Sequence, residues 1–116
     1  MTPANTSHRA DCEIVSRWLF ESAVPYWTSH GIDRHGLAYE ELEFDGTPKE
    51  LGYRRSLVQF RQVYVFARAA LAGGASPSLP GELFHRAAAA AWHPEGGFVH
   101  KLDPNGLVAD ASRDLY

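Results

Sequence analysis

The chain has 116 residues, of which 45% are hydrophobic and 22% charged, and its formal net charge is −3. This composition is typical of a globular protein that buries a core. Lys and Arg do not cluster as nucleic-acid binding requires, and no apolar run approaches the roughly 20 residues that cross a bilayer. The single cysteine, Cys12, excludes an internal disulfide. We therefore expect a cytoplasmic protein with no nucleic-acid partner and no membrane partner.

The first third of the chain predicts one long helix that follows a frayed polar tail at residues 1–9. Apolar residues recur at helical spacing from about Asp11 to His30. Pro25 is expected to kink this helix or divide it in two. Gly31 follows the last turn, where a left-handed C-terminal cap is common.

A β-hairpin is predicted next. Residues 37–44 form its first strand, Asp45 and Gly46 its turn, and residues 49–51 a short partner strand. The acidic side chains at positions 40, 41, 43 and 45 indicate a solvated strand edge. The alternative is a pair of catalytic carboxylates of the kind that glycoside hydrolases use.

A second helix, residues 54–72, is apolar around most of its circumference, which is typical of a buried helix. Arg61 lies in its middle. A buried guanidinium stays charged, so it needs either a carboxylate partner or a polar cavity that holds an oxygen-rich ligand. Both readings stay open. Arg54 and Arg55, at the start of the helix, oppose the helix dipole without an evident reason.

The third helix is alanine-rich and ends at Trp92, with Ser78 as its expected N-cap and Pro80 in its first turn. A second hairpin is predicted at residues 97–108. The tryptophans Trp18, Trp27 and Trp92 are interpreted as core residues rather than as sugar-stacking platforms.

Two segments of the chain have similar sequences. Residues 36–46 read GLAYEELEFDG and residues 97–106 read GFVHKLDPNG, each after an aromatic-rich helical segment. A recurrence after about sixty residues is typical of repeat architectures. The sequence predicts a mainly α chain with small β-hairpin insertions, in which residues 1–116 form a single partial domain of a larger helical-repeat protein.

Three segments together resemble the N-acylglucosamine 2-epimerase family, and within it the mannose isomerase-like branch. They read YWTSHGIDRHGLAYEELEFDG, RRSLVQFRQVYVFARA and GGFVHKLDPNGLVADASRDLY. One departure is His35-Gly36-Leu37, where the family usually has Gly-Gly-aromatic. The resemblance implies the N-terminal part of an (α/α)6 barrel, a monosaccharide substrate, and no metal or cofactor. It also implies a sugar 2-epimerase or aldose–ketose isomerase that works by proton transfer at C2 through an enediolate.

The resemblance assigns substrate-binding roles to Arg61, in the RQVY segment, and to Tyr116, in the DLY segment. The family's two catalytic histidines have no counterpart here, so no catalytic residue is expected in this chain. The six histidines show no metal-ligand spacing. Uncovered helix faces predict a homo-oligomer. The alternatives are a truncated, non-catalytic module that binds carbohydrate or protein, and a glycoside hydrolase on the same barrel.

Overall fold

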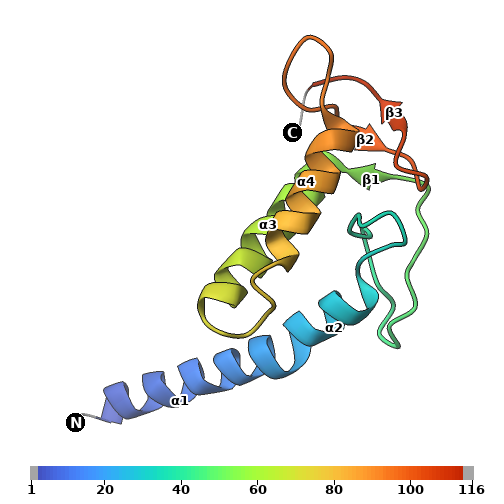
Figure 1. Ribbon diagram of the computed structural model, residues 1–116. Helices are drawn as coiled ribbons and strands as arrows, with labels where there is room; N and C mark the ends of the chain where they lie inside the picture. Colours follow the sequence, from blue (N-terminus) through green and yellow to red (C-terminus); the bar gives the residue numbers. More distant parts are fainter. Residues whose placement is uncertain (1–2, 114–116) are drawn as a thin grey trace.

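The computed structural model describes the backbone of residues 3–113 and the side chains of residues 7–113, and it is mainly helical with a small antiparallel sheet at one end (Figure 1). The mainly α class is thus confirmed, while a complete barrel stays a prediction. The elements in chain order are α1 (Pro3–Trp18), η1 (Leu19–Ala23), α2 (Val24–His30), β1 (Arg54–Arg55), α3 (Ser56–Leu71), α4 (Leu79–Ala91), β2 (Lys101–Leu102) and β3 (Val108–Asp110).

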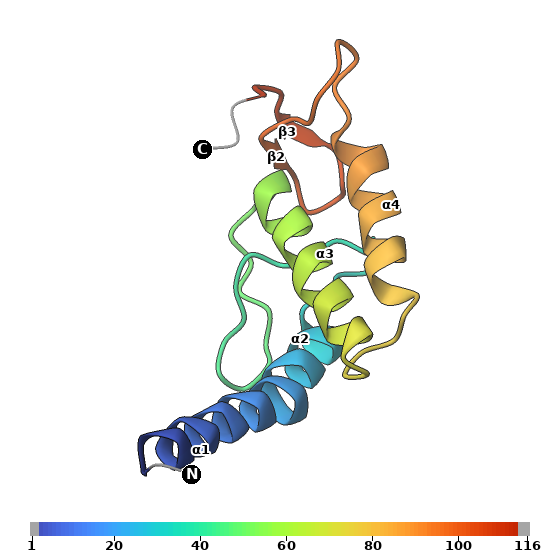
Figure 2. The same ribbon diagram turned by 90° about the vertical axis from the view of Figure 1, so that its left-hand side faces the viewer.

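Helices α1 and α2 form one long rod that projects from the body, joined by a π-helical turn, η1 (Figures 1 and 2). Pro25 has no N–H and its ring crowds the carbonyl four residues earlier, so a wider turn directly before it relieves that clash. The predicted interruption is therefore confirmed. The prediction of a frayed tail is wrong for residues 3–9, because α1 already begins at Pro3.

Gly31 ends α2 but does not form the predicted left-handed cap, since its φ is −92°. Its N–H donates to the Trp27 carbonyl at 2.8 Å. A Cβ at this position would lie 2.4 Å from Cε3 of the Trp27 ring. The glycine is required here by the close approach of the indole rather than by backbone handedness.

The predicted strand at residues 37–44 is absent. Five-residue turns at residues 33–37 and 43–47 border this segment instead, and each is closed by an isolated bridge, Ile32 with Ala38 and Leu42 with Pro48. In the turn that starts at Asp33, the Asp33 N–H donates to the Leu37 carbonyl at 2.7 Å and the Gly36 N–H donates back to Asp33 at 3.0 Å. Gly36 has a φ of +78°, which a glycine adopts without strain.

Within residues 3–113 the same turn occurs four times, and this confirms the sequence repeat. The turns start at Asp33, Glu43, His93 and Asp103, and each has a glycine with positive φ at its fourth position. The third and fourth turns follow the first and second by sixty residues, so Gly36 corresponds to Gly96. The second hairpin of the sequence prediction is confirmed in part, because β2 and β3 pair as antiparallel strands around the fourth turn.

The first and second turns form one turn unit, residues 33–47, and the third and fourth turns form its second copy, residues 93–107. Helices α3 and α4 lie side by side and pack against both turn units (Figure 2). A cluster of buried side chains, against which Phe60 of α3 packs, lies where α4 meets the turns and the second hairpin: Leu37, Ala87, Ala91, Val99 and Leu102. The alanines of α4 have small side chains, which lets the turns approach the helix closely. Pro80 lies in the first turn of α4 as expected, but Ser78 makes no capping hydrogen bond, and its hydroxyl contacts Ser76 instead.

Leu102→Ala is expected to lower the free energy of unfolding by about 2–5 kcal/mol, since it leaves a cavity at a fully buried position. Leu107→Ala is the matched control, because Leu107 lies in the same hairpin and is 65% exposed. Its effect should stay within about 0.5 kcal/mol. Urea unfolding followed by circular dichroism measures both, and equal losses would contradict the position of the core.

Candidate functional site

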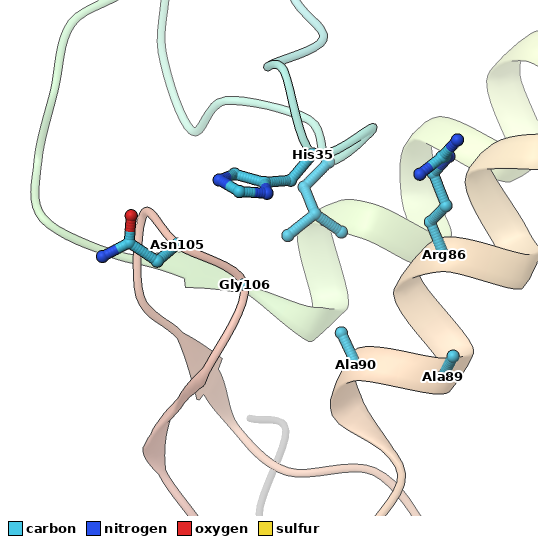
Figure 3. A pocket seen from close by; sticks show the side chains of 7 residues that line it. His35, Arg86, Ala89, Ala90, Asn105 and Gly106 are labelled. Carbon is cyan, nitrogen blue, oxygen red and sulfur yellow. The ribbon is translucent and has the colours of Figure 1, made fainter.

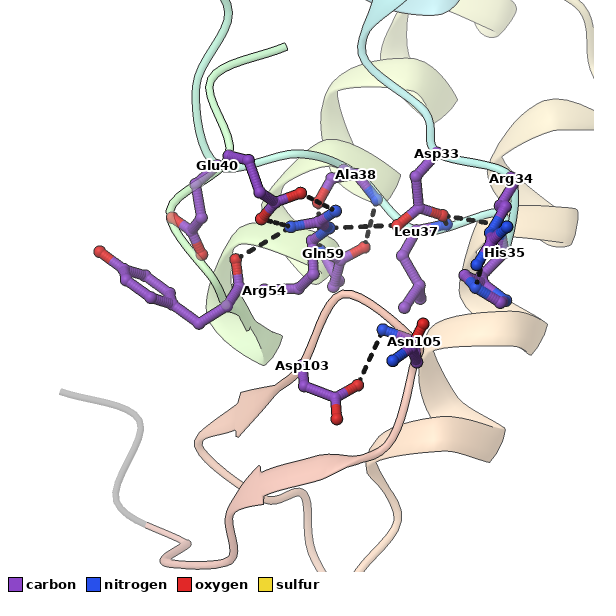
Figure 4. Close-up of polar contacts among 12 residues, drawn as sticks. Asp33, Arg34, His35, Leu37, Ala38, Glu40, Arg54, Gln59, Asp103 and Asn105 are labelled. Atoms are coloured by element: carbon purple, nitrogen blue, oxygen red, sulfur yellow. Dashed lines mark hydrogen bonds and ion pairs between the residues drawn. The ribbon is translucent and has the colours of Figure 1, made fainter.

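Arg54 is the buried cation among the described residues, and its side chain is only 3% exposed. Its Nε donates to Oδ2 of Asp33 at 3.1 Å (Figure 4). Its two terminal nitrogens donate to the two Glu50 carboxylate oxygens at 2.8 and 3.0 Å. The guanidinium also lies 4.6 Å from the centre of the Tyr39 ring. Two carboxylates and an aromatic face compensate for the water that this charge has lost.

Asp33 connects Arg54 to the first turn. One carboxylate oxygen, Oδ2, accepts from Arg54, while Oδ1 accepts the backbone N–H groups of His35 and Leu37 at 2.8 and 3.0 Å. The Asp33 side chain is 4% exposed. The shape of the turn and the position of the helix start are therefore held by one side chain.

Arg55 forms a separate ion pair with Glu40, in which Nη2 of Arg55 lies 2.9 Å from Oε2 of Glu40. Glu40 also accepts the Arg55 backbone N–H, and its side chain is only 4% exposed. The predicted solvated edge is wrong for Glu40, whereas the Glu41 pair with Lys49 is exposed as expected. These partners explain why two arginines are tolerated at a helix start, and they leave Glu40 engaged rather than free for glycoside hydrolysis.

Two polar side chains in the first turn of α3 join it to both copies of the turn unit. The Gln59 amide is fully buried and makes two hydrogen bonds with the Ala38 backbone, at 2.7 and 2.8 Å. The Ser56 hydroxyl donates to the Val99 carbonyl at 2.6 Å. Neither residue was predicted from the sequence to be functional. The signal was a pair of polar residues three positions apart in a helix that is otherwise mostly apolar.

Arg61 is exposed, so its predicted burial is wrong. The buried face of α3 carries Ser56, Gln59, Phe66 and Ala69, and Arg61 lies on the opposite face with Tyr64, which is 66% exposed. Within residues 7–113 Arg61 makes no ion pair or side-chain hydrogen bond. The structural salt bridge considered for it is therefore not formed with any carboxylate of these residues. Tyr116 lies outside the described residues.

The other candidates are placed as follows. Trp18 and Trp92 are 61% and 57% exposed, so their assignment to the core is wrong, and Trp27 is half-buried. Nδ1 of His100 is buried without a hydrogen-bond partner in the described part of the chain.

Among residues 3–113, no three His, Cys, Asp or Glu side chains converge as a metal-ligand set. Over the same residues, no helix has the length and hydropathy of a membrane span.

The candidate residue Arg61 thus lies exposed on a helix that the two turn units hold in place. In sequence, the chain is similar to a mannose-6-phosphate isomerase from Rhizobium meliloti (strain 1021), with 36% identity over 109 residues. The match covers 88% of this chain but only 27% of the relative, so the chain spans about a quarter of that protein's length. No protein-family model matches the chain, and no solved structure does.

Arg54→Ala is expected to destabilise the fold by about 3–5 kcal/mol, because it leaves the Asp33 carboxylate buried without its cation. Arg61→Ala removes the same side chain from an exposed position of the following helix and should change stability by no more than about 0.5 kcal/mol. Chemical denaturation at neutral pH distinguishes the two variants. Similar losses would show that Arg54 does not hold the turn to the helix.

Acid should weaken the contact between Glu50 and Arg54. The hydrogen bond from Arg54, supported by the Gly52 N–H, lowers the pKa of Glu50 from 4.5 to about 2. The folded-state pKa is the lower one, so the stabilisation is complete above pH 4.5 and is lost as pH falls toward 2. Glu50 is half-exposed, which keeps the effect modest.

The test is the difference in free energy of unfolding between wild type and Glu50→Gln. It should be largest above pH 4.5 and disappear near pH 2. Glu41→Gln serves as the control, since its pair with Lys49 is solvent-exposed. A wild-type advantage that persists unchanged at pH 2 would contradict the assignment.

Proposed function

We propose that this chain is a section of a sugar isomerase, of the aldose–ketose isomerase or 2-epimerase type. The observation that carries the proposal is the 36% identity to a mannose-6-phosphate isomerase over 88% of this chain. Because the chain corresponds to about a quarter of that relative, the activity of a whole enzyme, its monosaccharide substrate and its cytoplasmic location belong to the proposal as well.

Arg61 is the substrate-binding group that we assign in this chain. Its guanidinium is exposed and has no partner within the described residues, so its donors are available to sugar hydroxyls. Proton transfer at C2 forms an enediolate, and a cation that binds this oxygen lowers the energy of the intermediate. Tyr116 is proposed as a second contact on the basis of the family resemblance. No residue of this chain is assigned the acid–base role.

The exposed apolar side chains support a place inside a larger ring of helices. Ile14, Val15 and Trp18 on α1 are 61–64% exposed, and Leu71 on α3 is 84% exposed. Neighbouring helices in an (α/α)6 barrel would cover such faces, and a homo-oligomer would cover them in part. Both arrangements fit an element order in which one turn unit separates α2 from α3 and the other follows α4.

Titration of the chain with mannose, followed by NMR, should show weak binding without conversion to fructose. Arg61→Ala is expected to weaken this binding about tenfold, which is the size of effect that loss of one charge-assisted hydrogen bond produces. Arg17→Ala, an exposed arginine on α1, is the control and should bind as wild type does. Turnover by the chain alone, or unchanged binding by Arg61→Ala, would contradict these roles.

A further inference from the structure

Phe44 is fully exposed, although it is one of the largest apolar side chains of the protein. It is the second residue of the turn that starts at Glu43. The backbone closes this turn through a hydrogen bond from the Gly46 N–H to the Glu43 carbonyl, and the Asp45 carboxylate accepts the Thr47 N–H at 2.9 Å. The turn is therefore held without any contact from the phenyl ring.

The other three turns show that this position does not need an aromatic side chain. The equivalent residues are Arg34, Pro94 and Pro104. The turn geometry thus gives no reason for a phenyl ring in the second turn. Aromatic side chains are enriched in protein–protein interfaces, where they fill pockets of the partner. Phe44 has the form of such an anchor.

The surroundings of Phe44 are acidic. Glu41, Glu43 and Asp45 are all exposed, and Lys49 is paired with Glu41 at 3.1 Å. Glu43 and Asp45 form no ion pair within the described residues. A pocket that complements this tip has an apolar floor, a cation at its rim and no carboxylate.

A hollow of this kind lies on the same chain, where α3 meets the rod (Figure 1). Its volume is about 420 Å³, and apolar cavities of about 150 Å³ bind benzene in other proteins. Arg68 is the one charged residue of its lining, and it is exposed without an ion pair within the described residues. The apolar side chains come from the rod and from α3, chiefly Leu19, Phe20, Val24, Tyr64 and Val65.

Three other hollows complement the tip less well. In the hollow of about 390 Å³ that Figure 3 draws, the Arg86 guanidinium points away from His35 and Asn105, so the cation does not face the apolar floor. Two hollows along α1 contain carboxylates, Glu13 in one and Asp11 in the other. These charges would repel an acidic tip.

We propose that the Phe44 tip of one copy inserts into the hollow between the rod and α3 of a second copy, with its acidic neighbours beside Arg68. Phe44 is fully exposed, so it does not occupy the hollow of its own chain. Made in both directions, this contact closes a dimer. It gives the homo-oligomer a definite interface, and it does not depend on sugar binding by Arg61.

Analytical ultracentrifugation of the full chain over a range of concentrations should show a dimer in equilibrium with monomer. Phe44→Ala should raise the dissociation constant at least about tenfold, because the apolar surface of the ring stays in water. The variant should fold normally, since the ring makes no contact within its own chain. Leu107→Ala, which removes an exposed apolar side chain from the fourth turn, is the matched control and should dimerise as wild type does.

A charge exchange tests the position of the tip. Arg68→Glu should weaken the dimer, and the double variant Arg68→Glu with Glu43→Arg should restore it, which a merely structural effect of either change would not do. In a dimer of differently labelled copies, NMR should show intermolecular NOEs from the Phe44 ring to the methyl groups of Leu19 and Val65.

A monomer at every concentration, an unchanged dimer in Phe44→Ala, a charge exchange without recovery, or absence of these NOEs would each overturn the proposal. Phe44→Ala should bind mannose as wild type does, so failure of the dimer and failure of the proposed function can be distinguished.

Discussion

The buried ion pair between Arg54 and Asp33 is the constraint on which the rest of this structure depends. Both side chains are at most 4% exposed, so the Asp33 carboxylate is not tolerated without its cation, while Arg54 has a second partner in Glu50. Asp33 also holds the first turn through two backbone N–H groups. The start of α3 is therefore tied to a turn twenty-one residues earlier, and the positions of all later side chains on α3 follow from this contact.

The two copies of the turn unit are attached to α3 in different ways. The first copy uses side chains, namely Arg55 with Glu40 and Gln59 with the Ala38 backbone. The second copy uses mainly backbone, through the pairing of β1 with β2 and the bond from Ser56 to Val99. Both attachments face one side of the helix. As a result the opposite side, which carries Arg61, is left open to solvent or to a ligand.

Much of the secondary structure was predictable because it depends on neighbours in the sequence. The three helical segments, the interruption near Pro25 and the turn at Asp45 and Gly46 all have local causes. The strand predicted at residues 37–44 failed for a different reason. Its alternating pattern was real, but a glycine turn on each side shortens the pairing to isolated bridges. The repeat was visible in the sequence, whereas the residue-by-residue correspondence between its two copies came only from the hydrogen bonds of the turns.

By itself, the sequence determined the helices, the glycine turns and their recurrence, since each is set by dihedral preferences and hydrogen bonds within a few residues. Only the tertiary structure decided which arginine is buried. Arg61 has apolar neighbours along its helix and is exposed, while Arg54 is enclosed. A guanidinium can leave water only where a carboxylate meets it, and the Asp33 carboxylate comes from a distant turn that no local pattern places there.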